Sequence, residues 1–109
     1  MKEGDIGLAA LPQSDGQFKL RPVLLLKYLP DFGDFVVCGI STQLRHEQKG
    51  MDEILLPDAT NRLKHPSLVR LTYLHTLSVI SLQGTIGHIS SDLHGELLRR
   101  LARFLSSGV

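Results

Sequence analysis

The 109-residue sequence has little of several features that would place it in a specialised class. It contains one cysteine, Cys38, so an internal disulfide is excluded and a reducing compartment, the cytoplasm, is expected. No apolar run approaches the roughly 20 residues of a membrane span, and the acidic start of the chain does not resemble a signal peptide. The 12 Lys and Arg residues balance 11 Asp and Glu residues, so net charge alone indicates neither a nucleic-acid-binding tail nor an acidic partner.

The common metal, phosphate and nucleophile motifs are also missing. The five histidines are scattered, with no CxxC pair and no HExxH motif, so neither a metal site nor another cofactor is expected. There is no Gly-rich phosphate loop and no GxSxG elbow. Cys38 lies inside an apolar run, where a thiolate is disfavoured, so we interpret it as a core residue and not as a nucleophile.

Hydrophobic patterning predicts a mainly β (α+β) fold in one domain spanning residues 1–109. Short apolar or alternating segments bounded by Pro, Gly and Asp predict strands at residues 6–11, 23–29, 35–41, 51–56, 67–74 and 82–89. Turn residues at 12–16 and 31–34 separate the first three, and the second of these turns predicts an antiparallel pair. Residues 45–50 are predicted to form a charged loop. The expected architecture is a small curled sheet or barrel flanked by a helix.

The helix is predicted from the point where the hydrophobic period changes. From Ser90 onward, apolar residues recur at helical spacing, with Ser90 or Ser91 as the N-cap. Arg99, Arg100 and Arg103 fall on the polar face of this helix, and we interpret them as solvated surface.

A cluster of polar side chains is expected where three strands end. Its members are Lys19 and Arg21 at the start of one strand, Ser41, Thr42 and Gln43 at the end of its antiparallel neighbour, and Arg70 with Thr72 in a third. Antiparallel pairing places Arg21 near Ser41, and Gly39 either leaves room for a ligand or marks a bulge. Arginine, hydroxyl and carboxamide groups without a metal suit a phosphodiester, because a guanidinium binds its oxygens bidentately.

At these residues the chain resembles the PemK/MazF family of toxins. The motifs that carry the resemblance, in order, are Gly4-Asp5-Ile6, Asp15-Gly16, Lys19 with Arg21-Pro22-Val23, Ile40-Ser41-Thr42-Gln43, Leu63-Lys64, Pro66-Ser67-Leu68-Val69-Arg70-Leu71, His75-Thr76-Leu77 and Ile86-Gly87. Each motif is weak alone, but their order and spacing match over nearly the whole chain.

The resemblance implies an SH3-like barrel, a homodimer, a cognate antitoxin and metal-independent endoribonuclease activity on single-stranded RNA. It implies Arg21 and Ser41 as catalytic residues, and we assign the other polar residues of the cluster to binding RNA: Lys19, Thr42, Gln43, Arg70 and Thr72. Ser41 stands where the family commonly has threonine, which keeps the hydroxyl. Thr72 stands where many members have Asp, which removes an acid that could move protons.

The sequence leaves the proton acceptor and the function class open. An unactivated hydroxyl is too weak a base for Ser41 to take a proton, so His75 and His46 are the candidates. Strand alternation puts Arg70 and Thr72 on one face and His75 on the other, which favours His46. Two alternatives remain beside the nuclease: a PemK-like module that binds RNA or protein without cutting, and an inhibitor of DNA gyrase similar to CcdB.

Overall fold

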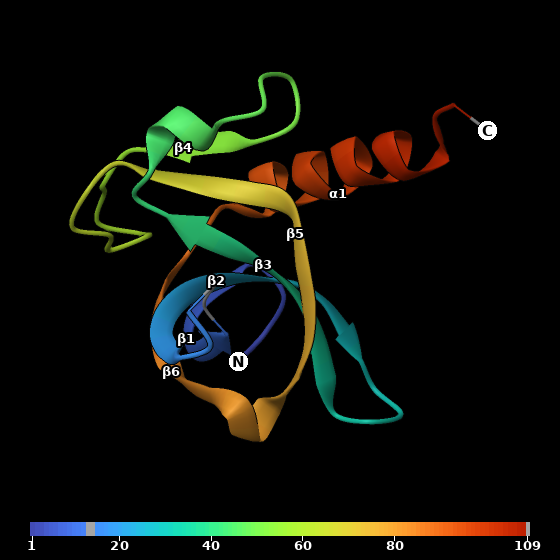
Figure 1. The fold of residues 1–109 in the computed structure, drawn as a ribbon. Helices are drawn as coiled ribbons and strands as arrows, with labels where there is room; N and C mark the ends of the chain where they lie inside the picture. Colours follow the sequence, from blue (N-terminus) through green and yellow to red (C-terminus); the bar gives the residue numbers. More distant parts are fainter. Residues whose placement is uncertain (13–14, 109) are drawn as a thin grey trace.

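The predicted mainly β fold with a terminal helix is confirmed by the computed structural model, which describes residues 1–12 and 15–108 (Figure 1). The elements are β1 (Asp5–Pro12), β2 (Phe18–Leu29), β3 (Asp34–Ser41), the short 3₁₀ helix η1 (Leu44–His46), β4 (Glu53–Leu55), β5 (Ser67–Ser78), the 3₁₀ helix η2 (Val79–Ser81), β6 (Leu82–His88) and α1 (Ser91–Ser106). None of the helices in these described ranges has the length and apolar character needed to cross a membrane.

The strands form one antiparallel sheet in the order β4-β5-β3-β2-β1-β6. Figure 1 shows that the sheet curls into a barrel-like shape, with α1 lying across one end of it. The turn after Leu29 joins β2 to β3 as predicted, with Leu29 opposite Asp34. The turn expected at residues 12–16 includes Gln13 and Ser14, which lie outside the described residues.

Three strand boundaries differ by two or more residues from the sequence prediction: the start of β2, the start of β4 and the end of β5, which runs to Ser78 and not only to Leu74. β2 begins at Phe18 and not at Val23, because residues 18–22 pair with β1 from Pro12 to Leu8. Pro22 is opposite Leu8 of β1 and has no register partner on the described residues of β3, so its missing N–H does not end the strand. β4 covers only Glu53–Leu55, because the chain turns before it through hydrogen bonds from Met51 N and Asp52 N to the Gln48 carbonyl.

The hydrophobic core is divided between the two sides of the curled sheet. One cluster joins the sheet to α1 and includes Leu24, Ile40, Leu71, Leu97 and Leu101, all buried. The second cluster fills the curl itself, with members on β1, β2, β3 and β6. Each fully buried aliphatic side chain stabilises the fold by roughly 1.5 to 3 kcal/mol relative to exposure, so α1 is held mainly by its buried leucines.

Helix α1 begins as predicted, and one of its arginines corrects the prediction. The Ser90 Oγ accepts a hydrogen bond from Leu93 N at 3.1 Å, so Ser90 is the N-cap. Arg100 is not a solvated residue: its side chain is 19% exposed and its Nη1 donates to the carbonyls of Met51 (3.1 Å) and Asp52 (3.2 Å). Sequence periodicity missed this contact because the polar edge of the helix faces the chain before β4.

The two glycines of β6 have different structural roles. Gly84 has φ +84°, and the pairing of β6 with β1 is irregular around it. Gly87 lies against the neighbouring loop, where an added Cβ would be 2.4 Å from the Asn61 carbonyl oxygen and 2.5 Å from that of Thr60. Only a residue without a side chain fits this approach.

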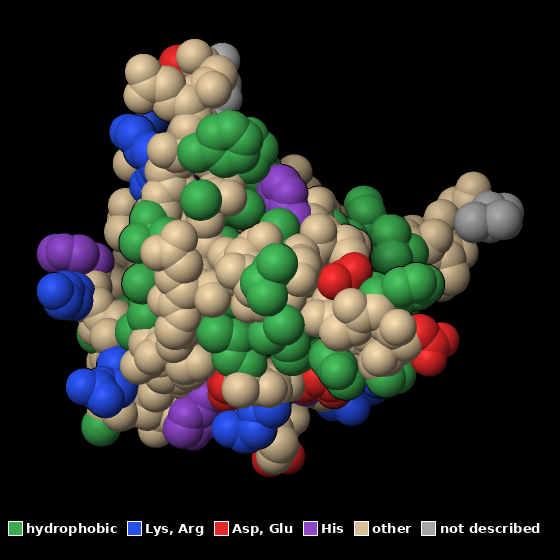
Figure 2. Space-filling view, turned by 90° about the horizontal axis from the view of Figure 1, so that it is seen from below, with side chains coloured by type: hydrophobic (Ala, Val, Ile, Leu, Met, Phe, Trp, Pro, Cys, Tyr) green, Lys and Arg blue, Asp and Glu red, His purple; other side chains and the backbone are tan. Residues whose placement is uncertain are grey.

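The end of the molecule away from α1 carries exposed apolar side chains. Figure 2 shows this end, where hydrophobic side chains gather around the middle of the face. Phe32 in the β2–β3 turn is 79% exposed and Ile80 in η2 is 88% exposed. A hollow of about 580 Å³ beside them is lined by Met1, Tyr28, Phe35 and Val79, among others. An apolar patch of this kind is typical of a surface that contacts another protein.

Candidate active site

A cleft of about 210 Å³ opens where β2, β3 and β5 meet the loop after β3. The residues that line it are Leu11, Arg21, Gly39, Ile40, Ser41, Thr42, Gln43, His46, Arg70 and Tyr73. Five of the seven site residues predicted from the sequence therefore line one cavity: Arg21, Ser41, Thr42, Gln43 and Arg70.

The pairing of three strands brings these residues together. Val23 of β2 and Arg70 of β5 flank Gly39 of β3 on its two sides. Arg21 lies two residues before Val23, and Ser41 lies two residues after Gly39. Because β2 and β3 are antiparallel, Arg21 and Ser41 reach the same end of the sheet. The hairpin argument from the sequence thus agrees with the structure on the neighbourhood of Arg21 and Ser41.

The loop that follows Ser41 is organised by local hydrogen bonds. The Ser41 Oγ accepts a hydrogen bond from Gln43 N at 3.0 Å, and the carbonyls of Thr42 and Gln43 accept from Leu44 N and His46 N, each at 3.1 Å. This turn explains why an apolar strand ends in Ser-Thr-Gln, since a hydroxyl at the strand end closes the turn into η1. A serine hydroxyl that accepts one hydrogen bond still has a proton to donate.

A bulge in β5 corrects the predicted alternation of that strand. Between the pairs Cys38–Leu74 and Gly39–Arg70, β3 advances one residue and β5 advances four, so three residues of β5, Leu71 to Tyr73, have no opposite partner. The expectation that Arg70 and Thr72 share a face is therefore wrong for the cleft, because a bulge changes the phase of side chains along a strand. Arg70 lines the cleft together with Tyr73 instead.

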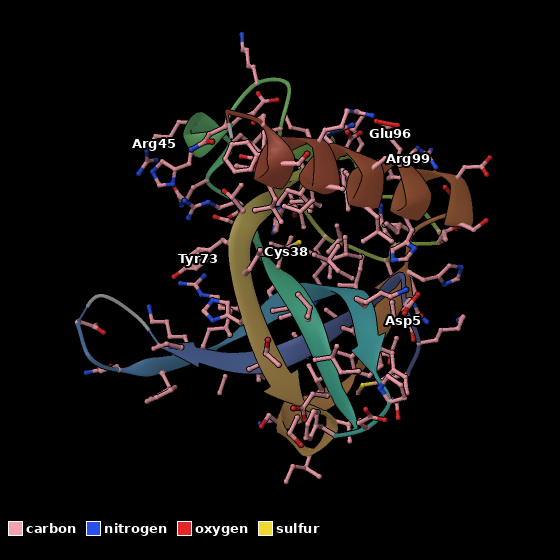
Figure 3. The ribbon with its side chains drawn as sticks, turned by 90° about the vertical axis from the view of Figure 1, so that its right-hand side faces the viewer. Asp5, Cys38, Arg45, Tyr73, Glu96 and Arg99 are labelled. Atoms are coloured by element: carbon pink, nitrogen blue, oxygen red, sulfur yellow. The ribbon has the colours of Figure 1, made fainter. Side chains whose placement is uncertain are left out.

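Tyr73 is the cleft residue that sequence reasoning missed. Its ring lies under the Arg70 guanidinium, with the Arg70 Cζ 4.9 Å from the ring centroid. Figure 3 shows the Tyr73 side chain projecting to the same side of the molecule as Arg45, while Asp5 lies on the opposite side. A Cβ on Gly39 would lie 3.6 Å from the Tyr73 ring, so the glycine makes close contact with this aromatic wall. An alternating pattern contains no signal for such a bulge.

Lys19 and Thr72 do not line the cleft. Lys19 pairs with Leu11 on the extended part of the β1–β2 hairpin, beyond Arg21, and Thr72 is an exposed residue of the bulge. Their assignment to RNA binding stays a prediction for the surface outside the cavity.

The two candidate histidines differ in their relation to the cleft. His46, the last residue of η1, is exposed and lines the cavity. His75 lies behind Tyr73, with the two ring centroids 5.1 Å apart, and its buried Nε2 has no hydrogen-bond partner among the described residues. Of the two imidazoles, that of His46 has access to a molecule bound in the cleft.

The electrostatics of the cleft suit an anion. Arg21 and Arg70 contribute two guanidinium groups, and none of the lining residues in the described part of the chain is an Asp or Glu. Among the described residues, no group of three or more His, Cys, Asp or Glu side chains is placed to hold a metal ion. Burial, and secondarily the charge of Asp52, raises the pKa of the Cys38 thiol to about 12, so this thiol is an inert core group.

A family model described as "PemK-like, MazF-like toxin of type II toxin-antitoxin system" matches residues 2–105 of this chain. The chain belongs to this toxin family. Among solved structures, it is similar to the Mycobacterium tuberculosis toxin MazF-mt6, with 27% identity, 93% of this chain and 95% of that chain covered, and a TM-score of 0.70. No curated protein sequence matches the chain.

Two further solved structures share the fold of this PemK-like toxin. One is MazF from Deinococcus radiodurans, with 19% identity, 96% of each chain covered and a TM-score of 0.71. The other is described as an endoribonuclease in complex with its cognate antitoxin from a mycobacterial species, with 13% identity, 100% of this chain and 98% of that chain covered, and a TM-score of 0.74.

Proposed function

We propose that this chain is an endoribonuclease that cleaves single-stranded RNA in the cleft between Arg21, Ser41 and Arg70 without a metal ion. The observation that carries the proposal is the convergence of two guanidinium groups and a serine hydroxyl in one cleft whose lining, as far as it is described, has no carboxylate. The membership of the chain in a family of toxins supports this activity.

The chemistry needs no cofactor if the RNA supplies its own nucleophile. The 2′-hydroxyl of the ribose attacks the adjacent phosphorus, the bond from phosphorus to the 5′ oxygen of the next nucleotide breaks, and a 2′,3′-cyclic phosphate forms. The main demand is then to stabilise the negative charge that develops on the phosphoryl oxygens. Arg21 and Arg70 meet this demand, because guanidinium groups form charge-assisted and bidentate hydrogen bonds with phosphate oxygens.

The remaining cleft residues orient the RNA and move the protons. The Ser41 hydroxyl donates to the 2′-oxygen or to a phosphoryl oxygen, the imidazole of His46 accepts the 2′-hydroxyl proton, and the leaving 5′ oxygen takes a proton from solvent water. Imidazole is suited to this step because it exchanges protons near neutral pH. Thr42 and Gln43 bind the RNA at the cleft edge, where amide and hydroxyl groups read unstacked bases.

The Arg21→Ala variant provides the decisive experiment. Purified parent protein and variant are incubated with a long single-stranded RNA in the presence of EDTA, and the products are resolved on a sequencing gel. Removal of a preorganised donor lowers the rate by about a hundredfold to a thousandfold, so specific cuts should come from the parent alone. Lys27→Ala is the matched control, because it removes an exposed cation from the same strand outside the cleft.

Equal cutting by parent and Arg21→Ala, or no cutting across a broad set of RNA sequences, would contradict the nuclease assignment. RNA retention without cutting would then support the binding module. Loss of supercoiling activity when the protein is added to DNA gyrase would support the gyrase inhibitor.

The partners we propose are a second copy of the chain and a cognate antitoxin. The exposed apolar face around Phe32 and Ile80 supports a protein partner, because such faces are usually covered. Light scattering on a sizing column tests the homodimer. A monomer at all concentrations would rule it out.

A further inference from the structure

Asp52 holds an unusual place just behind the cleft. Asp52 is only 7% exposed. Each of its carboxylate oxygens accepts a hydrogen bond from a backbone N–H, Oδ1 from that of Leu71 at 3.0 Å and Oδ2 from that of Gln48 at 2.9 Å. A buried carboxylate is costly unless it is hydrogen-bonded, so two such bonds identify a built arrangement and not a chance contact.

The first of these bonds supports the β5 bulge. Leu71 is the first of the three bulge residues without a partner on β3, so its amide needs an acceptor from elsewhere. The Asp52 Oδ1 is that acceptor. Leu71 lies in the chain directly after Arg70 and two residues before Tyr73, and both of these residues line the cleft. The carboxylate therefore holds the backbone on which one wall of the cleft is built.

The second bond supports the opposite wall. Gln48 follows the η1 segment, two residues after His46, and its carbonyl accepts from Met51 N at 3.0 Å and Asp52 N at 2.9 Å. One carboxylate thus connects two segments of the chain. The first carries residues 41–46, and the second is the bulge that carries Arg70 and Tyr73.

Helix α1 fixes the position of Asp52 itself. Arg100 Nη1 donates to the carbonyls of Met51 and Asp52, and both terminal nitrogens of its guanidinium lie 3.3 Å from the Glu53 Oε1. These bonds anchor residues 51–53 to the helix, so the carboxylate does not move freely between the two walls.

We propose that Asp52 is a positioning residue of the active site, which holds the Arg70–Tyr73 wall and the Ser41–His46 wall at the separation that cleavage requires. The inference rests on the proposed function, since it assigns Asp52 a role in that reaction. Asp52 does not line the cleft, so it acts through the residues that do. Its effect on the rate comes from geometry, and a displacement of about 1 Å at a reacting centre costs about a hundredfold in rate.

The test compares Asp52→Ala and Asp52→Asn with a matched control, Asp58→Ala. Asp58 is also a carboxylate that caps two backbone amides, with its Oδ1 accepting from Thr60 N (2.8 Å) and Asn61 N (2.6 Å), but it lies in a loop that does not line the cleft. Asparagine keeps one acceptor at position 52, so at most one of the two amides remains bonded. Should the alanine variant unfold, the asparagine variant carries the test.

Three measurements are made on each folded variant. Amide hydrogen exchange at Leu71 and Gln48 is followed by NMR. The constants kcat and KM are measured with a cleavable RNA substrate. Binding affinity is measured with a 2′-O-methyl RNA that cannot be cut. Both Asp52 variants should exchange one or both amides faster. Their kcat should fall by about a hundredfold for alanine, with a smaller change in KM and in affinity. Asp58→Ala should change none of these.

Two results would overturn the proposal: unchanged protection of both amides in Asp52→Ala, or a kcat no lower than that of Asp58→Ala. If the parent itself cuts no RNA, the proposed function fails separately. The exchange rates at Leu71 and Gln48, with the chemical shifts of Arg70, Tyr73 and His46, then still decide whether Asp52 holds the two walls.

Discussion

The guanidinium of Arg70 lies over the ring of Tyr73, with 4.9 Å between the Arg70 Cζ and the ring centroid. A cation over an aromatic face at a partly exposed site is stabilised by about 0.5 to 1 kcal/mol. The ring therefore restrains one of the two cations that we assign to the phosphate.

Replacing Tyr73 separates the role of its ring from that of its hydroxyl. Tyr73→Ala should lower kcat/KM for RNA cleavage by about twofold to fivefold, because Arg70 loses its restraint. Tyr73→Phe keeps the ring and should cleave at the parent's rate. A loss in Tyr73→Phe equal to that in Tyr73→Ala would mean that the hydroxyl, and not the ring, contributes.

The role of Ser41 is tested by removing and restoring its hydroxyl. Ser41→Ala should lower the cleavage rate by about tenfold to a hundredfold, the range for losing a hydrogen bond to a charged group. Ser41→Thr keeps the hydroxyl that accepts from Gln43 N and should cleave at close to the parent's rate. If both variants lose the same activity, the hydroxyl is not the group that acts.

Cys38 should be inert in the folded protein. With burial raising its pKa to about 12, the thiolate fraction at about pH 8 is on the order of one in ten thousand. A thiol reagent added at that pH should label Cys38 only after a denaturant has been added. Rapid labelling of the native protein would contradict the burial.

The same thiol links stability to alkaline pH. The unfolded thiol ionises near pH 9.0 and the folded thiol near 12, so the folded state holds this proton more tightly. The resulting stabilisation is fully present below pH 9 and is lost between pH 9 and 12, at up to about 1.4 kcal/mol per pH unit. Urea unfolding at about pH 8 and about pH 10.5 should therefore show the stability difference between parent and Cys38→Ala shrinking as pH rises. A constant difference would show that Cys38 does not titrate in this way.

Two glycine substitutions should change stability in opposite directions. Gly87→Ala should destabilise the fold by about 1 to 3 kcal/mol, because its Cβ would meet the backbone carbonyls of Thr60 and Asn61. Gly95→Ala in α1 should stabilise it by about 0.5 to 1 kcal/mol, because only the flexible Arg99 side chain lies close to the new Cβ. Thermal unfolding of both variants measures the difference, and a stable Gly87→Ala variant would show that the loop at residues 60–61 can yield.

The sequence by itself determined the order of the elements, the β2–β3 hairpin and the neighbourhood of Arg21 and Ser41. These features are encoded locally: hydrophobic period separates strand from helix, turn residues mark the hairpin, and antiparallel pairing brings the two strand ends together. The N-cap at Ser90 was predictable for the same reason.

Only the tertiary structure decided the composition of the cleft wall and what supports it. Because of the three-residue bulge in β5, the residue that lines the cleft beside Arg70 is Tyr73 and not Thr72. The bulge forms where the amide of Leu71 bonds to Asp52, a residue that lies far from it in the sequence, and Arg100 of α1 holds that part of the chain. A bulge supported by a distant carboxylate leaves no trace in hydrophobic alternation, because its stability comes from contacts that exist only after the chain has folded.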